Sequence, residues 1–135
     1  MFYGVYGSGK TTYANIYCNE LEIIRVGQQG TANFHSIDCR KVLNFSKTIQ
    51  NCEGYCNWIP LTCSNLVYFI FDEVDNLKLN EQRLLKTFMN RENIVCILTT
   101  NHLNRVDDGV RDRCYEIDFN AANPNDYLPR LRQLI

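Results

Sequence analysis

The sequence has no hydrophobic run of the roughly 18–20 residues that are needed to cross a lipid bilayer. Its first residues, Met1-Phe2-Tyr3-Gly4, contain neither a basic region nor a long apolar core, so they do not form a secretory signal. The sequence also contains no internal repeat and no low-complexity tract. We therefore expect an intracellular protein that is not inserted in a membrane.

An excess of charge of one sign is also missing. Lys and Arg number 14 and Asp and Glu number 15, which gives a net charge of −1. This balance argues against extensive nucleic-acid binding by this chain alone, but it allows a local basic stripe or one assembled from several subunits. The seven cysteines are an odd number, and without a secretory signal they are expected to be free thiols rather than a disulfide framework.

The composition is that of one globular domain, since 45% of the 135 residues are apolar and 21% are charged. Three apolar runs do not alternate with polar residues, which predicts strands covered on both faces, as in a parallel sheet. The predicted strands are residues 1–3, 33–37, 66–71, 94–98 and, at an edge, 114–119. The predicted helices are residues 11–21, 40–49 and 81–90, the last capped by Asn80, with a loop at 51–65 and a short helix in the tail that ends at residue 135. This order predicts an α/β fold with an open, mostly parallel five-stranded sheet flanked by helices.

The most specific motif is a phosphate-binding loop. Gly4-Val5-Tyr6-Gly7-Ser8-Gly9-Lys10-Thr11 fits G-x-x-x-x-G-K-[ST] in full, after a short strand and at the start of a helix. Its glycines let successive N–H groups point at phosphate oxygens, and the helix N-terminus adds partial positive charge. Lys10 would reach the β- and γ-phosphates of ATP, and the Thr11 hydroxyl would hold Mg²⁺. The predicted nucleotide-binding residues are Gly4, Gly7, Ser8, Gly9, Lys10, Thr11 and Thr12.

An acidic segment, Asp72-Glu73-Val74-Asp75, follows the strand predicted at 66–71. In an open α/β sheet, the carboxyl end of a parallel strand borders the crevice where ligands bind. Asp72 is predicted to complete the Mg²⁺ site with Thr11, and Glu73 to polarise the attacking water as general base.

Polar residues follow the next strand as well. Asn101 is placed to orient water against the γ-phosphate, although it could instead cap a turn. Farther on, Arg111 or Arg113 could stabilise transition-state charge on a neighbouring subunit's ATP. The alternative is an intrachain salt bridge that involves Arg111, Asp112 and Arg113. Spacing alone does not decide between the role at a neighbour's ATP and the intrachain salt bridge.

The order of these motifs resembles the nucleotide-binding domain of AAA+ ATPases, and within them clamp-loader subunits of the compact phage and viral kind. Asn33-Phe34-His35-Ser36-Ile37-Asp38 is similar to the clamp-loader segment Glu-Leu-Asn-Ala-Ser-Asp, and residues 81–89 are similar to that family's central helix. Asn101 matches the family's first sensor residue. Arg113-Cys114 matches the end of its Ser-Arg-Cys motif, which implies that Arg113 is the arginine finger.

The resemblance implies an ATPase subunit that works in a ring with other AAA+ subunits, with a sliding clamp and primed DNA as partners. It divides the chain into a nucleotide-binding core at 1–122 and the start of a truncated lid domain at 123–135. Asp112 replaces the family's Ser, and His35 replaces its Asn. His35 could therefore sense or restrain Glu73, or it could be a hydrogen-bonded core histidine.

Several weaker patterns leave alternatives open. Cys52, Cys56 and Cys63 resemble part of a zinc module, but their irregular spacing favours unliganded thiols. Arg40 and Lys41 could contact a DNA phosphate, although a solvated surface pair is the simpler interpretation. Other functions consistent with the motifs are a helicase loader, a viral initiator, a nucleotide kinase, or a module that binds ATP without hydrolysing it.

Overall fold

The computed structural model describes residues 1–27, 34–57 and 66–120. Its strands form one five-stranded sheet in the order β2-β3-β4-β1-β5, and every neighbouring pair is parallel. The strands are β1 (Phe2–Tyr3), β2 (Phe34–Asp38), β3 (Val67–Asp72), β4 (Ile94–Thr100) and β5 (Ile117–Asp118). The predicted α/β class is confirmed, and so is the edge position of the last strand.

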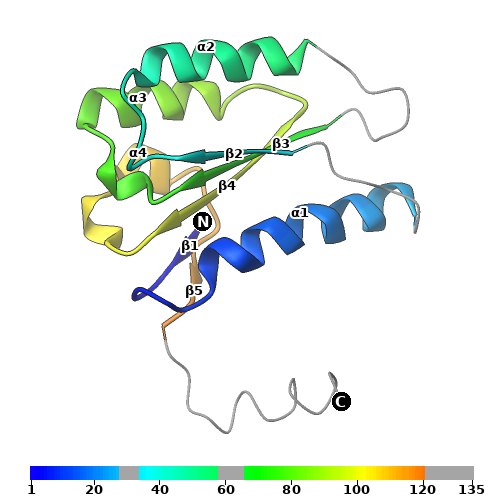
Figure 1. Ribbon diagram of the computed structural model, residues 1–135, viewed down its shortest axis with the longest axis horizontal. Helices are drawn as coiled ribbons and strands as arrows, with labels where there is room; N and C mark the ends of the chain where they lie inside the picture. The colour runs from blue at the N-terminus through cyan, green and yellow to red at the C-terminus, as the bar shows by residue number, and fades with distance from the viewer. Residues whose placement is uncertain (28–33, 58–65, 121–135) are drawn as a thin grey trace, which may run out of the picture.

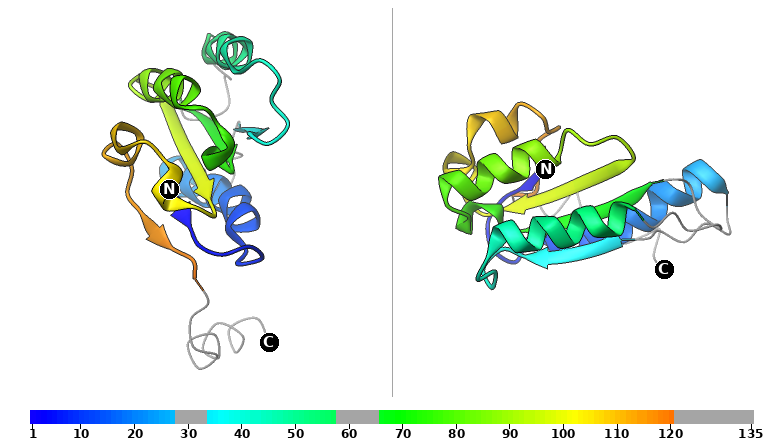
Figure 2. Two further views of the ribbon diagram at one scale, coloured as in Figure 1. Left: turned by 90° about the vertical axis from the view of Figure 1, so that its left-hand side faces the viewer. Right: turned by 90° about the horizontal axis from the view of Figure 1, so that it is seen from above.

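Helices cover both faces of this sheet. The helices are α1 (Lys10–Val26), α2 (Phe45–Cys56), α3 (Leu79–Phe88) and α4 (Asp108–Arg111), with 3-10 turns η1 (Val74–Asn76) and η2 (Leu103–Arg105). Helices α2 and α3 lie on one face, and α1 lies on the other (Figures 1 and 2). Within the described residues, no helix has the length and apolar character to span a membrane.

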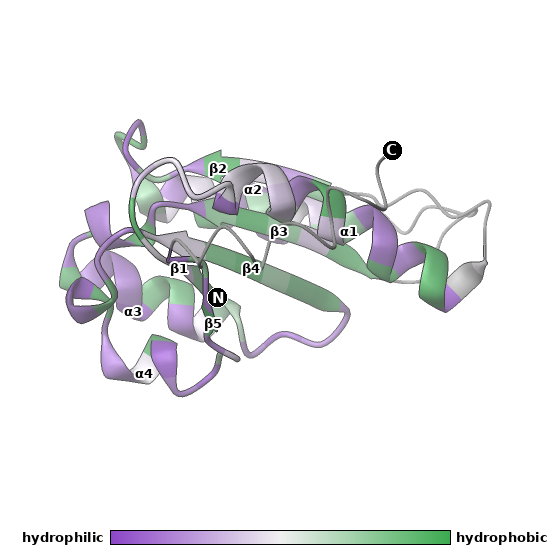
Figure 3. Cartoon of the chain, turned by 90° about the horizontal axis from the view of Figure 1, so that it is seen from below, coloured by the Kyte–Doolittle hydropathy of each residue, from purple (hydrophilic) through white to green (hydrophobic). Residues whose placement is uncertain are grey.

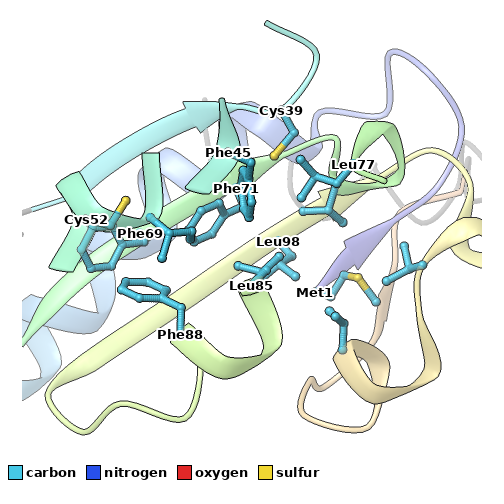
Figure 4. Close-up of a cluster of buried hydrophobic side chains, with 14 of the residues drawn as sticks. Met1, Cys39, Phe45, Cys52, Phe69, Phe71, Leu77, Leu85, Phe88 and Leu98 are labelled. Carbon is cyan, nitrogen blue, oxygen red and sulfur yellow. The ribbon is translucent and has the colours of Figure 1, made fainter. Parts of the chain in front are cut away.

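Strand β3 supplies side chains to two separate hydrophobic clusters. Phe69 and Phe71 pack toward α2 and α3, where Phe45 and Phe88 meet them (Figure 4). Tyr68 and Ile70, between them in sequence, pack toward α1 instead. All six residues of β3 are buried, which explains why the strand reads as a continuous hydrophobic run rather than an alternating one. The same strand and β4 are the predominantly hydrophobic centre of the molecule in Figure 3.

The second helix is displaced toward the C-terminus from its predicted position at 40–49. It begins after Asn44, whose side-chain oxygen accepts a hydrogen bond from the Lys47 amide at 3.1 Å. It continues to Cys56, so the prediction of a loop was wrong for residues 51–56. Phe45, Ile49 and Cys52 are buried at helical spacing, and this packing outweighs the low helix propensity of Gly54.

The predicted cap of the third helix was also wrong. Asn80 lies inside α3, and the N-cap residue is Lys78. The Lys78 amide donates a hydrogen bond to the Glu81 carboxylate at 2.7 Å, which satisfies one of the donors that a helix start leaves unpaired. The lid domain and the helix predicted in the tail lie outside the described residues.

The six cysteines in the described ranges are free thiols. Burial raises the pKa of Cys18 and of Cys52 to about 11 each. The Cys56 thiol donates a hydrogen bond to the Cys52 carbonyl oxygen at 3.2 Å. No three His, Cys, Asp or Glu side chains within residues 1–27, 34–57 and 66–120 are grouped as metal ligands, and Cys63 lies outside these ranges.

We predict that Tyr68→Phe lowers the free energy of unfolding by about 1.5–3 kcal/mol, the range for a hydrogen bond to a charged group. The Tyr68 hydroxyl donates to the Glu22 carboxylate at 2.7 Å, and both side chains are fully buried between β3 and α1. Urea unfolding followed by circular dichroism measures the change. The control is Tyr55→Phe, because Tyr55 is 45% exposed. Equal stability of the Tyr68 and Tyr55 variants would contradict the prediction.

Candidate nucleotide-binding site

The parallel sheet brings the ends of β1, β3 and β4 to one edge. Tyr3 pairs with Thr100, and the Gly4 amide donates to the Thr100 carbonyl at 3.2 Å, so the loop after β1 starts level with the end of β4. A cavity of about 330 Å³ opens at this edge. It is lined by Tyr6, Gly7, Ser8, Gly9, Lys10, Thr11, Thr12, Glu73, Thr99 and Asn101.

Two glycines of the loop are required by its geometry. Gly9 has φ 86°, a left-handed conformation that side-chain-bearing residues rarely adopt, directly before α1. At Gly4, a Cβ atom would lie 2.8 Å from the Phe119 backbone carbon, so any larger residue would push the loop off the segment that follows β5. Gly9 therefore permits the curvature of the loop, and Gly4 permits its close packing against the segment after β5.

Lys10 lies across the loop that precedes it. Its ammonium donates to the carbonyls of Gly4 and Val5 at 3.1 and 2.8 Å and to the Ser8 hydroxyl at 3.0 Å. Only 6% of the residue is exposed. Burial holds the pKa of Lys10 below its ordinary value, and the neighbouring carboxylates oppose that shift. The side chain thus places a buried positive charge where the motif predicts phosphate.

The two predicted metal ligands lie in contact. The Thr11 hydroxyl donates to Asp72 Oδ1 at 2.8 Å, which joins the start of α1 to the end of β3. Hydroxyl and carboxylate oxygens are ligands that Mg²⁺ prefers. The pair therefore fits the ion that the motif implies.

Thr99 is a residue of this site whose role the sequence analysis missed. Its buried hydroxyl donates to Asp72 Oδ1 and accepts from the Glu73 amide at 2.9 Å. One side chain of β4 thus orients both acidic residues at the end of β3. The only hint in the sequence is a threonine at the end of a strand expected to lie beside β3.

Glu73 has a left-handed backbone conformation, with φ 57° and ψ 57°. Its carboxylate lies 3.2 Å from Arg40 Nε, and the side-chain amide of Asn76 is 3.4 Å away. Arg40 is the basic residue that contacts Glu73 in the described structure. His35, predicted as a possible restraint on Glu73, stacks instead on Tyr55 at 4.0 Å and parallel to it.

Arg40 is itself held by Asp38. The guanidinium donates from Nε and Nη2 to the two Asp38 carboxylate oxygens at 3.1 and 3.0 Å. These bonds hold the pKa of Asp38 below its ordinary value. Arg40 therefore joins the ends of β2 and β3, while Lys41 beside it is largely exposed, with an 81% accessible side chain.

The structure separates the remaining candidates. Asn101 lines the cavity with Glu73, in line with its place after the strand predicted at 94–98. Arg113 does not line it, and instead donates to the Asn90 side chain and the Gly109 carbonyl at 2.9 and 2.8 Å. Arg111 forms an intrachain ion pair at 2.8 Å, and its partner is Glu116, a residue that the sequence analysis did not consider.

The sequence matches one family model over residues 1–121, the ATPase family associated with various cellular activities (AAA). The chain belongs to this AAA family.

The chain is also similar to individual proteins over part of their length. The chain is 25% identical to replication factor C small subunit 1 of Pyrobaculum arsenaticum over 136 residues, which are 99% of this chain and 40% of that protein. It is 27% identical to the sliding-clamp-loader large subunit of Escherichia phage RB69 over 138 residues, which are 96% of this chain and 38% of that protein. The AAA chain therefore spans less than half the length of these relatives.

A solved structure shares the fold. The crystal structure of a DNA polymerase III gamma subunit-related protein from Thermotoga maritima superimposes with a TM-score of 0.63 at 12% sequence identity. The superposition covers 98% of this chain and 44% of that one.

We predict that Thr99→Val lowers the free energy of unfolding by about 1–3 kcal/mol, because the buried groups of Asp72 and Glu73 lose their shared partner. Thermal and urea unfolding without nucleotide measure the loss. Thr99→Ser keeps the hydroxyl and removes a methyl group, so we expect it to cost only about 1 kcal/mol. If the Val variant were as stable as the Ser variant, Thr99 would not be what orients this site.

Proposed function

We propose that the chain binds ATP in the cavity at the carboxyl edge of the sheet and hydrolyses it as a subunit of a sliding-clamp loader. The observation that carries this proposal is the convergence of Lys10, Glu73 and Asn101 on one cavity, next to the contact between Thr11 and Asp72. A phosphate-binding lysine, a metal-ligand pair, a carboxylate base and a water-orienting amide are the parts that phosphoryl transfer to water requires.

The loop would bind the triphosphate through its backbone amides, with Lys10 on the terminal phosphates and Thr12 at the start of α1. Lys10 would exchange its present partners in the loop for phosphate oxygens. Thr11 and Asp72 would hold Mg²⁺, which would neutralise charge on the β- and γ-phosphates.

Glu73 would accept a proton from a water molecule that Asn101 orients. The water oxygen would form a bond to the γ-phosphorus while the bond from that phosphorus to the β–γ bridging oxygen breaks. The bridging oxygen would leave on ADP with the bonding electrons, so the products would be ADP and inorganic phosphate. Arg40 at 3.2 Å from Glu73 competes with the water for the carboxylate, so this contact would have to loosen for hydrolysis.

Arg113 would act between subunits. Arg113 lies outside the cavity of its own chain. Its hydrogen-bond partners in that chain are a neutral side-chain amide and a backbone carbonyl, so no carboxylate among the described residues holds it. An arginine so placed could reach the ATP of a neighbour in a ring and stabilise its transition state. The names of the relatives, replication factor C and sliding-clamp loader, support other AAA+ subunits, a sliding clamp and primed DNA as partners.

A second candidate function is an AAA module that binds ATP without hydrolysing it. The Arg40–Glu73 ion pair favours this alternative, because it occupies the proposed base.

The experiment that separates these functions measures ATP hydrolysis by the purified chain, with and without primed DNA and candidate partner subunits. We expect stimulation by both, because DNA would act on the assembled ring and Arg113 would act across a subunit contact. The Lys10→Ala variant is the control for contaminating ATPases, since it should not bind ATP. Binding without turnover under every condition would support the non-hydrolysing module.

Glu73→Gln should bind ATP with nearly wild-type affinity and reduce the hydrolysis rate by at least about 10²-fold, the contribution of a positioned general base. The amide preserves the shape of the side chain but cannot accept the proton. Equilibrium binding of a fluorescent ATP analogue and single-turnover hydrolysis measure the two effects. Glu53→Gln is the matched control, because Glu53 lies on α2 and does not line the cavity. Wild-type turnover by the Glu73 variant would assign the base to another residue.

A further inference from the structure

The phosphate-binding loop leaves a strand that has a neighbour on each side. Strand β1 lies between β4 and β5, and Tyr3, its last residue, pairs with Thr100 of β4 and with Asp118 of β5. The chain therefore leaves all three strands at the same level. Both flanking strands continue into segments that run beside the loop.

The two flanking strands end in the same kind of turn. After β4, the His102 amide donates to the Thr100 hydroxyl at 3.0 Å. After β5, the Asn120 amide donates to Asp118 Oδ1 at 2.8 Å. In each case, the side chain of the residue that pairs with Tyr3 fixes the backbone two residues farther on.

Each fixed residue contacts the loop with its own side chain. Asn120 Oδ1 accepts a hydrogen bond from the Val5 amide at 3.1 Å. The His102 ring packs edge-on against the Tyr6 ring, with centroids 6.1 Å apart and planes at 77°, a favourable geometry for aromatic pairs. The first two residues after Gly4 are therefore held from opposite sides.

The Asn120 contact lies outside the part of the loop that faces the cavity, and the His102 contact is made to a residue at the cavity's rim. Of the loop residues from Val5 onward, Tyr6 to Thr11 line the cavity and Val5 does not, so the Val5 amide can be tied to Asn120 without losing a phosphate donor. Tyr6 is 70% exposed, and His102 is the aromatic partner that its ring meets in the described structure. The loop thus depends on contacts from β4 and β5 for the position of its first turn.

We propose that His102 and Asn120 are positioning residues that fix the first turn of the phosphate-binding loop from its two neighbouring strands. They set nucleotide affinity without touching the nucleotide. This inference rests on the proposed binding of ATP in the cavity. Because a pre-formed loop binds ground state and transition state alike, losing either contact raises KM and leaves kcat unchanged.

The test compares His102→Ala, Asn120→Ala and the double variant for affinity toward fluorescent ADP and ATP analogues. We expect each single change to weaken both nucleotides by about two- to tenfold, as for loss of one aromatic pair or one hydrogen bond. The double variant should lose more affinity than either single variant, because the two contacts hold the loop through different strands. His102→Phe, which keeps an aromatic ring against Tyr6, should restore most of the affinity.

Two controls separate positioning from general destabilisation. His35→Ala removes the chain's other histidine, which packs on Tyr55, and Asn104→Ala removes an exposed asparagine in η2. Neither should change affinity beyond its effect on stability. The proposal would be overturned if the His102 and Asn120 variants bound ADP as tightly as wild type, or if kcat fell while KM stayed constant.

Hydrogen exchange of the nucleotide-free chain tests the same inference independently of ATP. Loss of Asn120 should speed exchange at the Val5 amide, and loss of His102 should speed exchange over the first turn of the loop, with α1 unchanged. Unchanged protection in both variants would overturn the inference even if the chain binds ATP. Failure of the wild-type chain to bind ATP, with faster loop exchange in the variants, would sink the proposed function and leave the positioning role intact.

Discussion

The parallel pairing of β1 with β4 and β5 is the constraint on which the candidate site depends. Strand β1 has only two residues, and its register places Tyr3 level with Thr100 and Asp118. A parallel sheet brings all carboxyl ends to one edge, so the loop, the acidic segment and Asn101 converge although about 100 residues separate them in sequence. A shift of one residue in β1 would turn its side chains to the wrong faces and carry the loop away from β3.

Two adjacent threonines of β4 hold the acidic segment from opposite faces of the sheet. Thr99 bonds to Asp72 and to the Glu73 amide, whereas the Thr100 hydroxyl donates to Asp75 at 2.7 Å. Successive side chains of a strand point to opposite faces, so neither threonine could do both. The left-handed conformation of Glu73, which costs of the order of 1–3 kcal/mol, persists because these bonds fix the residues on both sides of it.

Much of this arrangement could be predicted from the sequence, because its patterns are local. Strands β1, β3 and β4 follow from the three non-alternating apolar runs, and the loop follows from its glycines and Lys10. The end of α2 could not be predicted, because Gly54 has a low helix propensity and the burial of Cys52, which favours the helix, depends on tertiary packing. The sequence likewise left His35 either as a restraint on Glu73 or as a core histidine, and it did not point to Arg40, which is the residue that reaches Glu73. The residue that contacts the end of β3 is set by the register of β2 and by the length of the side chain. Sequence spacing gives no information on the register, so this contact could not be predicted.

The buried cysteines have a practical consequence for following motions of the molecule. Cys18 packs in the layer between α1 and the sheet, and Cys52 packs in the layer under α2. With pKa values of about 11, both remain protonated at neutral pH, and only the thiolate reacts with alkylating agents. Alkylation of Cys18 therefore requires that α1 separate from the sheet, and alkylation of Cys52 requires that α2 do so. The chain carries a natural chemical reporter of opening in each of its two layers, so labelling rates can show which layer loosens first.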